Sequence, residues 1–595
     1  MPALHPYGGS VRKLVLGIDV GTTYSGIAYA ILDPGEVPVI HGVTRFPGQE
    51  NAAGDSKIPS ILYYKPDGSV ACAGAEAALP GTDLEVEDND YRFVEWFKLH
   101  LRPEHLDAGE IKRRDLPLLP PGKTVVDVFA DFLTYLFRCS KRYICETHAN
   151  GDSLWSSLED RIEFVLSHPN GWEGAQQGKM RQAAVMAGLV PQTPVGQARV
   201  HFITEGEASL NFCVQSGLTD ETMRDGQSVA IVDAGGGTVD ISSYSFVSVS
   251  PLVVEEATSA DCLLQGSTRV NVRAEAHIRK ILKESKFGND DDIKSMLDYF
   301  DKATKPVFKD DGESSYIKFG SMGCNDPSVK IRRGQLLLTG AEMLSFFQPS
   351  IDAIVTAVVK QREEAAKKFK TVFLVGGFAA SPFLYSALRS KLETLGLSLC
   401  RPDSHTSKAV ANGAVCFFLQ RFVAARVMKV TYGVEINAWF KPKDAEHVAR
   451  IANTFVHPSG HTMVRNGFSP ILGKGKSVRE TDEVSQPYHV WSDDSRALDR
   501  IACDITCYRG PGASPRWTDV DPELFTMLCT VHADTSRVTR KPKQGPKGTY
   551  YEQCYDVILL CGLTELQAQI RWIENFINCS GPAKIVYDDD LHAFQ

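Results

Sequence analysis

The sequence lacks several features that mark particular protein classes. It has no excess of positive charge, because 73 acidic residues outnumber 64 basic ones and leave a formal net charge of -9. Such a chain has no electrostatic reason to bind nucleic acid or an anionic membrane, so we expect neither as a partner. The 14 cysteines are scattered, and even Cys503 and Cys507, the closest pair, fit no common zinc spacing. We therefore expect reduced thiols in a cytoplasmic protein, with the nucleus as a further location.

Long hydrophobic runs are also scarce. The apolar run near the N-terminus is interrupted at Asp19, so we expect no signal peptide. The apolar stretch from Thr371 to Leu388 is divided by Gly376, Gly377 and Pro382, which favours a strand, a turn and a helix over a membrane span. What remains is the composition of a globular protein, 43% hydrophobic and 23% charged, long enough for roughly two to four domains.

Two β-rich runs, KLVLGID and GIAYAIL, occupy most of residues 13–32 and predict a hairpin. The segment that joins them contains Gly21, Thr22, Thr23 and Tyr24. Its backbone N–H groups meet little side-chain obstruction, and its hydroxyl groups add donors, which suits an anionic phosphate. Asp19 ends the first run and supplies a hard oxygen ligand that can reach, through water, a Mg²⁺ bound to the phosphates.

A second hairpin is predicted over residues 228–246, where SVAIVD and VDISSYSF flank another turn. That turn contains Gly235, Gly236, Gly237 and Thr238, and Asp233 stands where Asp19 stands in the first. The two aspartates and the two first glycines are separated by the same number of residues, which indicates an internal duplication. Two halves of this kind could close on one Mg·nucleotide from opposite sides.

With the strand, Gly-Gly turn and helix of residues 372–388, the two hairpins resemble the seventy-kilodalton heat-shock chaperones of the actin-like ATPase superfamily. The resemblance covers roughly residues 14–419. It implies an α/β, two-lobed actin-like ATPase fold with duplicated subdomains, lobe I at residues 1–225 and lobe II at 226–425. Elsewhere in this part, Thr339 and Glu342 predict a capping box, with Pro349 as a break between two helices.

The resemblance also implies roles for individual residues. Both turns would hold the phosphates of ATP or ADP, while Asp19 and Asp233 orient Mg²⁺ and its water shell. Lys98, in EWFKLHL, would be the catalytic lysine, and Glu205, in FITEGEASLNF, would orient the attacking water. Glu207 is a rival for the role of Glu205, because Gly-Glu follows where the family has Pro-Thr. The remaining positions expected near adenosine are Gly376, Gly377, Phe378, Lys305 and Asp403.

The pattern changes after about Arg426, where short alternating runs are separated by turn residues. We expect residues 426–595 to form a β-rich domain. In the chaperone family that position holds a peptide-binding β-sandwich followed by a helical lid. Neither the family's interdomain linker nor a long helical region after Trp572 is recognisable here, so the chain resembles a divergent, lidless branch of the member-twelve type.

Two functions remain open at this point. The first is a slow, chaperone-type ATP hydrolase that acts on polypeptide clients with a co-chaperone or exchange factor. The alternative is a nucleotide-regulated scaffold or signalling regulator with a protein partner, in which ATP occupancy rather than turnover sets the conformation. A small-molecule kinase is less favoured, because no aspartate motif clearly offers a general base for a phosphoryl acceptor.

Overall fold

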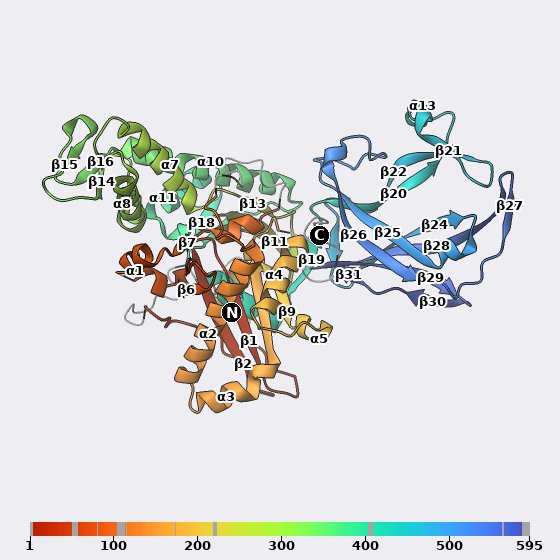
Figure 1. Cartoon of the computed structure of the whole chain (residues 1–595), viewed down its shortest axis with the longest axis horizontal. Coiled ribbons are helices and arrows are strands. Elements are labelled where there is room, and N and C mark those ends of the chain that lie inside the picture. Colours follow the sequence, from red (N-terminus) through yellow and green to blue (C-terminus); the bar gives the residue numbers. More distant parts are fainter. Residues whose placement is uncertain are drawn as a thin grey trace. The chain divides into compact units, whose positions relative to one another are not determined.

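The computed structural model describes residues 4–49, 57–79, 81–103, 114, 116–172, 174–217, 223–402, 408–561 and 565–585. Contacts divide the chain into two compact units. The first contains residues 1–172 and 179–422, and the second contains residues 173–178 and 423–595. The first unit combines sheets with helices and the second consists mainly of strands, so the expected α/β character is confirmed (Figure 1).

The first sheet has the strand order β3-β2-β1-β8-β9, with β4 paired to β2. The strands are β1 (Lys13–Asp19), β2 (Tyr24–Leu32), β3 (His41–Gly42), β4 (Lys57–Pro59), β8 (Ile162–His168) and β9 (Val200–Thr204). β1 and β2 form the predicted antiparallel hairpin, whereas β8 and β9 continue the sheet as parallel strands.

The second sheet of the first unit repeats this pattern. Its order is β18-β17-β10-β11-β12, with β13 paired to β11. The strands are β10 (Ser228–Ala234), β11 (Val239–Val249), β12 (Leu252–Glu256), β13 (Asp261–Leu263), β17 (Thr371–Val375) and β18 (Ser398–Cys400). β10 and β11 form the second predicted hairpin, and β17 and β18 follow in parallel. Both sheets therefore join an antiparallel hairpin to two parallel strands in the same order.

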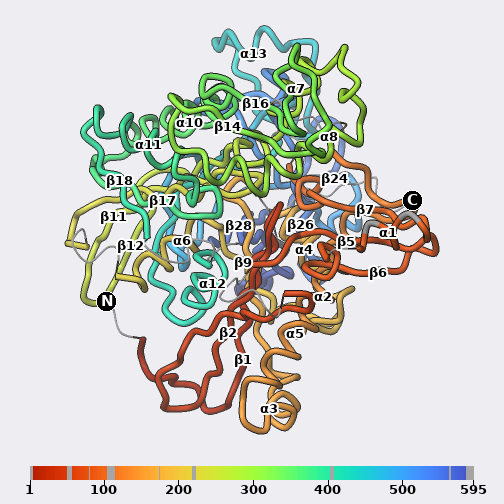
Figure 2. The backbone as a smooth tube through the Cα atoms, turned by 90° about the vertical axis from the view of Figure 1, so that its left-hand side faces the viewer, coloured from red at the N-terminus to blue at the C-terminus, as the bar shows by residue number. Residues whose placement is uncertain are grey.

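Helices alternate with these strands along the chain. They are α1 (Thr82–Asn89), α2 (Val125–Thr147), α3 (Gly151–Leu158), α4 (Gly174–Met186), α5 (Pro194–Gln197), α6 (Glu205–Gln215), α7 (Ser267–Ile281), α8 (Asp290–Tyr299), α9 (Lys305–Val307), α10 (Gly340–Glu364), α11 (Pro382–Thr394) and α12 (Ala409–Gln420). α6 and α12 lie against each other so closely that a Cβ on Gly413 would lie 1.8 Å from the Ala208 carbonyl oxygen (Figure 2). Each sheet has its own hydrophobic core, one including α2 and the other including α7, α10 and α11.

Helix α10 differs from the prediction. The capping box of Thr339 and Glu342 is present, but Pro349 lies inside one continuous helix rather than between two. The missing Pro349 N–H costs one helical hydrogen bond, and burial of Phe346, Phe347 and other core side chains compensates. By length and composition alone α10 could span a membrane, yet its inward side chains belong to the second core.

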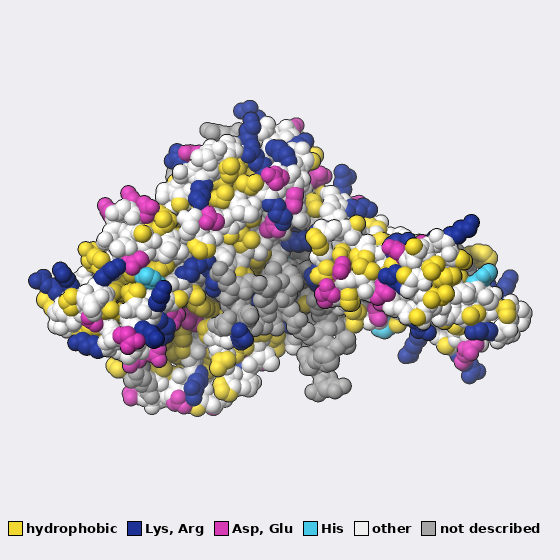
Figure 3. Space-filling view, turned by 90° about the horizontal axis from the view of Figure 1, so that it is seen from above, with side chains coloured by type: hydrophobic (Ala, Val, Ile, Leu, Met, Phe, Trp, Pro, Cys, Tyr) yellow, Lys and Arg dark blue, Asp and Glu magenta, His cyan; other side chains and the backbone are white. Residues whose placement is uncertain are grey.

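Within its described residues, the second unit has two antiparallel sheets that share a hydrophobic core. The first sheet has the order β21-β22-β20-β25-β26 and the second β24-β28-β29-β30, with β27 and β31 paired to β28 and β29. Their strands are β20 (Thr431–Trp439), β21 (Thr454–Val456), β22 (Thr462–Leu472), β24 (Glu483–Ser492), β25 (Arg500–Tyr508), β26 (Phe525–Asp534), β27 (Lys543–Gly545), β28 (Gly548–Cys561), β29 (Leu566–Glu574), β30 (Ile577–Ser580) and β31 (Lys584–Ile585). A further pair, β19 (Val423–Val427) and β23 (Ser477–Arg479), and the short helix α13 (Ala445–Ala449) complete the unit. On the face seen in Figure 3, acidic and basic side chains are interspersed among apolar ones.

Candidate functional site

The turns of the two hairpins lie directly against each other. A Cβ added to Gly236 would lie 2.0 Å from the Thr23 Oγ1, and one added to Gly237 would lie 2.4 Å from the Thr22 Oγ1. Real side chains do not approach this closely, so glycine at both positions lets the second turn pack on the threonines of the first. Two segments more than 200 residues apart therefore form one site.

The backbone of these turns has unused hydrogen-bond donors. The carbonyl groups of Gly235 and Gly236 accept hydrogen bonds from Ser267 and Thr268 at the start of α7, at 3.1 and 2.9 Å. Within the described residues, by contrast, the amide N–H groups of four turn residues donate no hydrogen bond. These four are Thr22, Thr23, Gly236 and Gly237. Unpaired amide donors on two facing turns are what an anionic group needs.

Asp19 lies at the end of β1 and is 3% exposed. Its Oδ1 accepts a hydrogen bond from the Ser167 hydroxyl at 3.0 Å, and its Oδ2 lies 2.8 Å from the Lys57 Nζ. Burial alone would raise the pKa of this carboxyl group, but the charges of Lys57 and Lys98 lower it below the ordinary value. Asp19 is therefore a charged carboxylate inside the protein.

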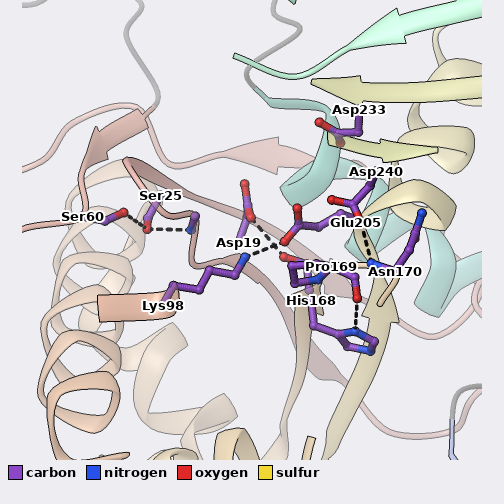
Figure 4. A network of polar contacts seen from close by, with 12 residues as sticks. Asp19, Ser25, Ser60, Lys98, His168, Pro169, Asn170, Glu205, Asp233 and Asp240 are labelled. Atoms are coloured by element: carbon purple, nitrogen blue, oxygen red, sulfur yellow. Dashed lines mark hydrogen bonds and ion pairs between the residues drawn. The ribbon is translucent and has the colours of Figure 1, made fainter. Parts of the chain in front are cut away.

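Lys98 and Glu205 form a buried ion pair, with the Nζ 2.5 Å from the Oε1 (Figure 4). Trp96 adopts a left-handed backbone with φ of +52°, and the short helix Phe97–Leu101 that follows carries Lys98 inward. The Nζ also lies 5.6 Å from the centre of the Trp172 ring, within range of a cation–π contact. Burial lowers the pKa of Lys98, but the carboxylates of Glu205 and Asp19 outweigh it and the net shift is upward.

Helix α6 supplies both Glu205 and Ser209 from one face. The Thr204 hydroxyl caps the helix by accepting from the Glu207 N–H at 3.2 Å, which fixes its first turn. Four residues after Glu205, the Ser209 hydroxyl donates to the Asp233 Oδ2 at 2.5 Å. Burial raises the pKa of Glu205, and Lys98 only partly offsets this. Of the two rival glutamates, the structure places Glu205 against Lys98.

Asp233 is buried near the end of β10. It lies beside Gly376, where the backbone conformation and the neighbouring atoms leave no room for a side chain. Gly376 has φ of +91°, and a Cβ there would lie 2.3 Å from the Asp233 Oδ1. Burial and the nearby Glu205 raise the pKa of Asp233 to about 7, against the hydrogen bond from Ser209. The turn that contains Gly376 and Gly377 therefore contacts Asp233.

Sequence reasoning missed Asp240, which pairs directly with Asp233 across β10 and β11. Its Oδ1 accepts a hydrogen bond from the Asn170 N–H at 2.5 Å, and it is completely buried (Figure 4). Ser167, Asn170 and Lys57 were also missed. The hairpin symmetry of VDAGGGTVD was the available signal for Asp240, and the four-residue spacing from Glu205 was the signal for Ser209.

The side chains of Lys305 and Phe378, two residues expected near adenosine, have partners of their own in the structure. The Lys305 Nζ binds Asp301 and donates to the Asn271 Oδ1 at 2.8 Å, and burial lowers its pKa. Phe378 is 5% exposed, and the centre of its ring lies 6.1 Å from the centre of the Phe347 ring in the second core. Only the backbone of Phe378 could therefore face a ligand. Gly377 has open space where a side chain would be, and Asp403 lies outside the described residues.

The carboxylates fit a hydrated Mg²⁺ better than a metal held by protein ligands alone. No cluster of three or more His, Cys, Asp or Glu side chains that could hold a metal occurs in the described part of the chain. Mg²⁺ usually keeps several waters and is bound by one or two carboxylates together with substrate phosphates. Asp19 and Asp233 can supply such oxygen contacts beside the unpaired amides of the turns.

Comparison with known proteins places these motifs in context. No protein-family model matches the chain. It is 24% identical over 561 residues to human heat shock 70 kDa protein 12B, which covers 80% of this chain and 78% of that protein. It is 22% identical over 564 residues to mouse heat shock 70 kDa protein 12A, covering 80% and 79%. The chaperone protein DnaK of Mesomycoplasma hyopneumoniae (strain J) is 23% identical over 442 residues, or 71% of this chain and 62% of DnaK. The family resemblance expected from the motifs is confirmed.

Proposed function

We propose that this chain, a heat-shock-70-like protein, binds ATP or ADP with Mg²⁺ at the paired hairpin turns and hydrolyses ATP slowly. One observation carries the proposal. The two turns, although distant in sequence, pack together through Gly236 and Gly237 and leave four amide N–H groups without acceptors in the described chain. In this proposal the two sheets of the first unit are the two lobes of an actin-like ATPase fold.

Each charged residue of the site has a separate role in the proposed hydrolysis. Asp19 and Asp233 would hold Mg²⁺ through its water shell, and the bound ion would supply positive charge to the phosphates. Lys98 stabilises negative charge that develops on the phosphoryl group, as expected where positioning and electrostatics supply most of the catalysis. Glu205 orients the attacking water. Because Lys98 and Glu205 bind each other at 2.5 Å, at least one of these groups must change partner before the reaction.

The ion pair also supports the alternative function. As long as Lys98 and Glu205 neutralise each other, neither acts on phosphate or on water, so this arrangement does not itself support turnover. A nucleotide-regulated scaffold therefore remains the second candidate, with ATP occupancy setting the conformation of the first unit. For either function the partner is a polypeptide, a client in the first case and a regulatory protein in the second, and the β-rich residues 426–595 are the proposed diverged, lidless peptide-binding domain.

Isothermal titration of the full chain with ATP·Mg²⁺, followed by single-turnover hydrolysis, tests the proposal. Binding with slow turnover supports the hydrolase, and binding without turnover supports the scaffold. Absence of binding would contradict both. Asp19→Asn and Asp233→Asn should each weaken Mg²⁺-dependent binding, and their combined effect should be less than additive because the two residues act on one metal.

A further inference from the structure

A second lysine, Lys57, lies partly buried in the site and has no role in the mechanism above. Lys57 belongs to the three-residue strand β4, and its Nζ lies 2.8 Å from the Asp19 Oδ2. The side chains are 16% and 4% exposed, so this ion pair is shielded from solvent. Such a pair differs from a surface salt bridge, because the low dielectric strengthens the attraction and makes either charge costly to leave alone.

The sheet register explains how Lys57 reaches Asp19 from two strands away. Lys57 pairs with Gly26 of β2, and Gly26 pairs in turn with Asp19 of β1. Residues paired directly across strands share one face of a sheet. Strands β4 and β1 lie on either side of β2, so they are two strand spacings apart, or about 10 Å. Gly26 of β2 lies between Lys57 and Asp19 and has no side chain to obstruct the lysine. The pairing of β4 with β2 and of β2 with β1 therefore fixes the ammonium group of Lys57 next to Asp19.

The charge of Lys57 acts on more than its direct partner. It lowers the pKa of Asp19, and it also opposes the upward pKa shifts of Glu205 and Asp233. The ammonium group thus lies within electrostatic range of carboxylates from both sheets. The site holds a buried ion pair, Lys98–Glu205, and a partly buried one, Lys57–Asp19.

We propose that Lys57 is a second phosphate-binding cation, which lets this site hold a nucleoside di- or triphosphate with reduced dependence on Mg²⁺. This rests on the proposed nucleotide binding at the same site. An ammonium group is a compact positive charge with three N–H donors and is a common partner of phosphate oxygens. Bound phosphates need nearby positive charge. Because Lys57 already supplies one positive charge next to Asp19, a metal ion needs to supply less of it.

The test measures ADP affinity of the full chain by titration calorimetry, in excess MgCl₂ and in EDTA, for wild type and Lys57→Met. We expect wild type to bind ADP in both buffers. Lys57→Met should lose about 10- to 100-fold in affinity in EDTA, the worth of a hydrogen bond to a charged group, and less in MgCl₂. Lys57→Arg keeps the charge and should restore binding in EDTA. Lys13→Met is the matched control, because Lys13 pairs with Glu163 at the far end of β1.

The outcomes separate this inference from the function on which it rests. A wild type that binds ADP in neither buffer overturns nucleotide binding, and the role of Lys57 with it. A wild type that binds ADP only with Mg²⁺ overturns the role of Lys57 alone. The role of Lys57 is also overturned if the ratio of ADP affinity in MgCl₂ to ADP affinity in EDTA is the same for Lys57→Met as for wild type. Thermal unfolding of each variant identifies loss of folding, and if Lys57→Met does not fold, failure of a folded Lys57→Arg to bind in EDTA overturns the inference.

Discussion

Replacing Lys98 by Met removes one member of a buried ion pair and leaves Glu205 without its cation. The two side chains are 3% and 11% exposed, so solvent can do little to compensate. Removing one partner of a buried pair costs about 3–5 kcal/mol. We expect a value near the lower end of that range, because the pKa of Glu205 is already raised by burial and the glutamate can become neutral by taking up a proton. Lys98→Met should also abolish most turnover.

The assay is a double-mutant cycle on the nucleotide-free full chain, with Lys98→Met, Glu205→Gln and the double variant. Urea unfolding followed by tryptophan fluorescence reports on this region, because Trp172 lies against Lys98. Only the transition of the first unit is analysed, since a chain of two units need not unfold in one step. The double variant should be about 1–3 kcal/mol more stable than the sum of the single effects predicts. Strict additivity, or a Lys98→Met variant as stable as wild type, would refute the buried pair.

Three further changes test the geometry of the site. Gly376→Ala forces a side chain into φ of +91° and 2.3 Å from the Asp233 Oδ1, so we expect a loss of about 1–3 kcal/mol in thermal unfolding together with weaker nucleotide binding. Gly236→Ala would place a Cβ 2.0 Å from the Thr23 Oγ1, so calorimetry should show at least about tenfold weaker ATP binding while the far-UV spectrum is unchanged. Glu205→Gln should slow single-turnover hydrolysis by at least about tenfold with little change in ATP affinity, because orienting water matters only as the reaction proceeds. Normal turnover in that variant would transfer the role to another carboxylate.

Much of the first unit's local structure could be predicted because its signals are local. The hairpins over residues 13–32 and 228–249 combine β-rich runs with turns of small residues, and their strands begin and end within a few residues of the predicted positions. The equal spacing of the two aspartates also indicates the repeated sheet pattern, because duplicated halves keep their motifs at a constant offset. The predicted break at Pro349 was wrong for a related reason, because a local helix-breaking signal was outweighed by burial on both sides of it.

The missed residues share a different property. Lys57 lies 38 positions from Asp19 in a strand of only three residues, too short for any alternation to be recognised. Ser167 and Asn170 lie at the end of a buried strand in an unremarkable run, and they enter the site only because β8 pairs with β1. Their placement depends on strand order in the sheet, which one sequence does not specify. Residue types and spacing thus identified the turns and aspartates, and sheet topology was needed for the groups that set their charge.

The two sheets of the first unit are alike in strand order and unlike in the charge around their aspartates. Asp19 has an ammonium group in direct contact, whereas Asp233 accepts its hydrogen bond from the neutral Ser209 hydroxyl. A carboxylate buried without a cation is costly to charge, and an incoming metal ion gains most where the existing charge is least compensated. If Lys57 serves as a phosphate-binding cation on the first turn, Asp233 would be the carboxylate with most to gain from holding a hydrated Mg²⁺. The repeated fold would then supply two similar phosphate turns, and the single lysine of β4 would decide which of them depends on metal.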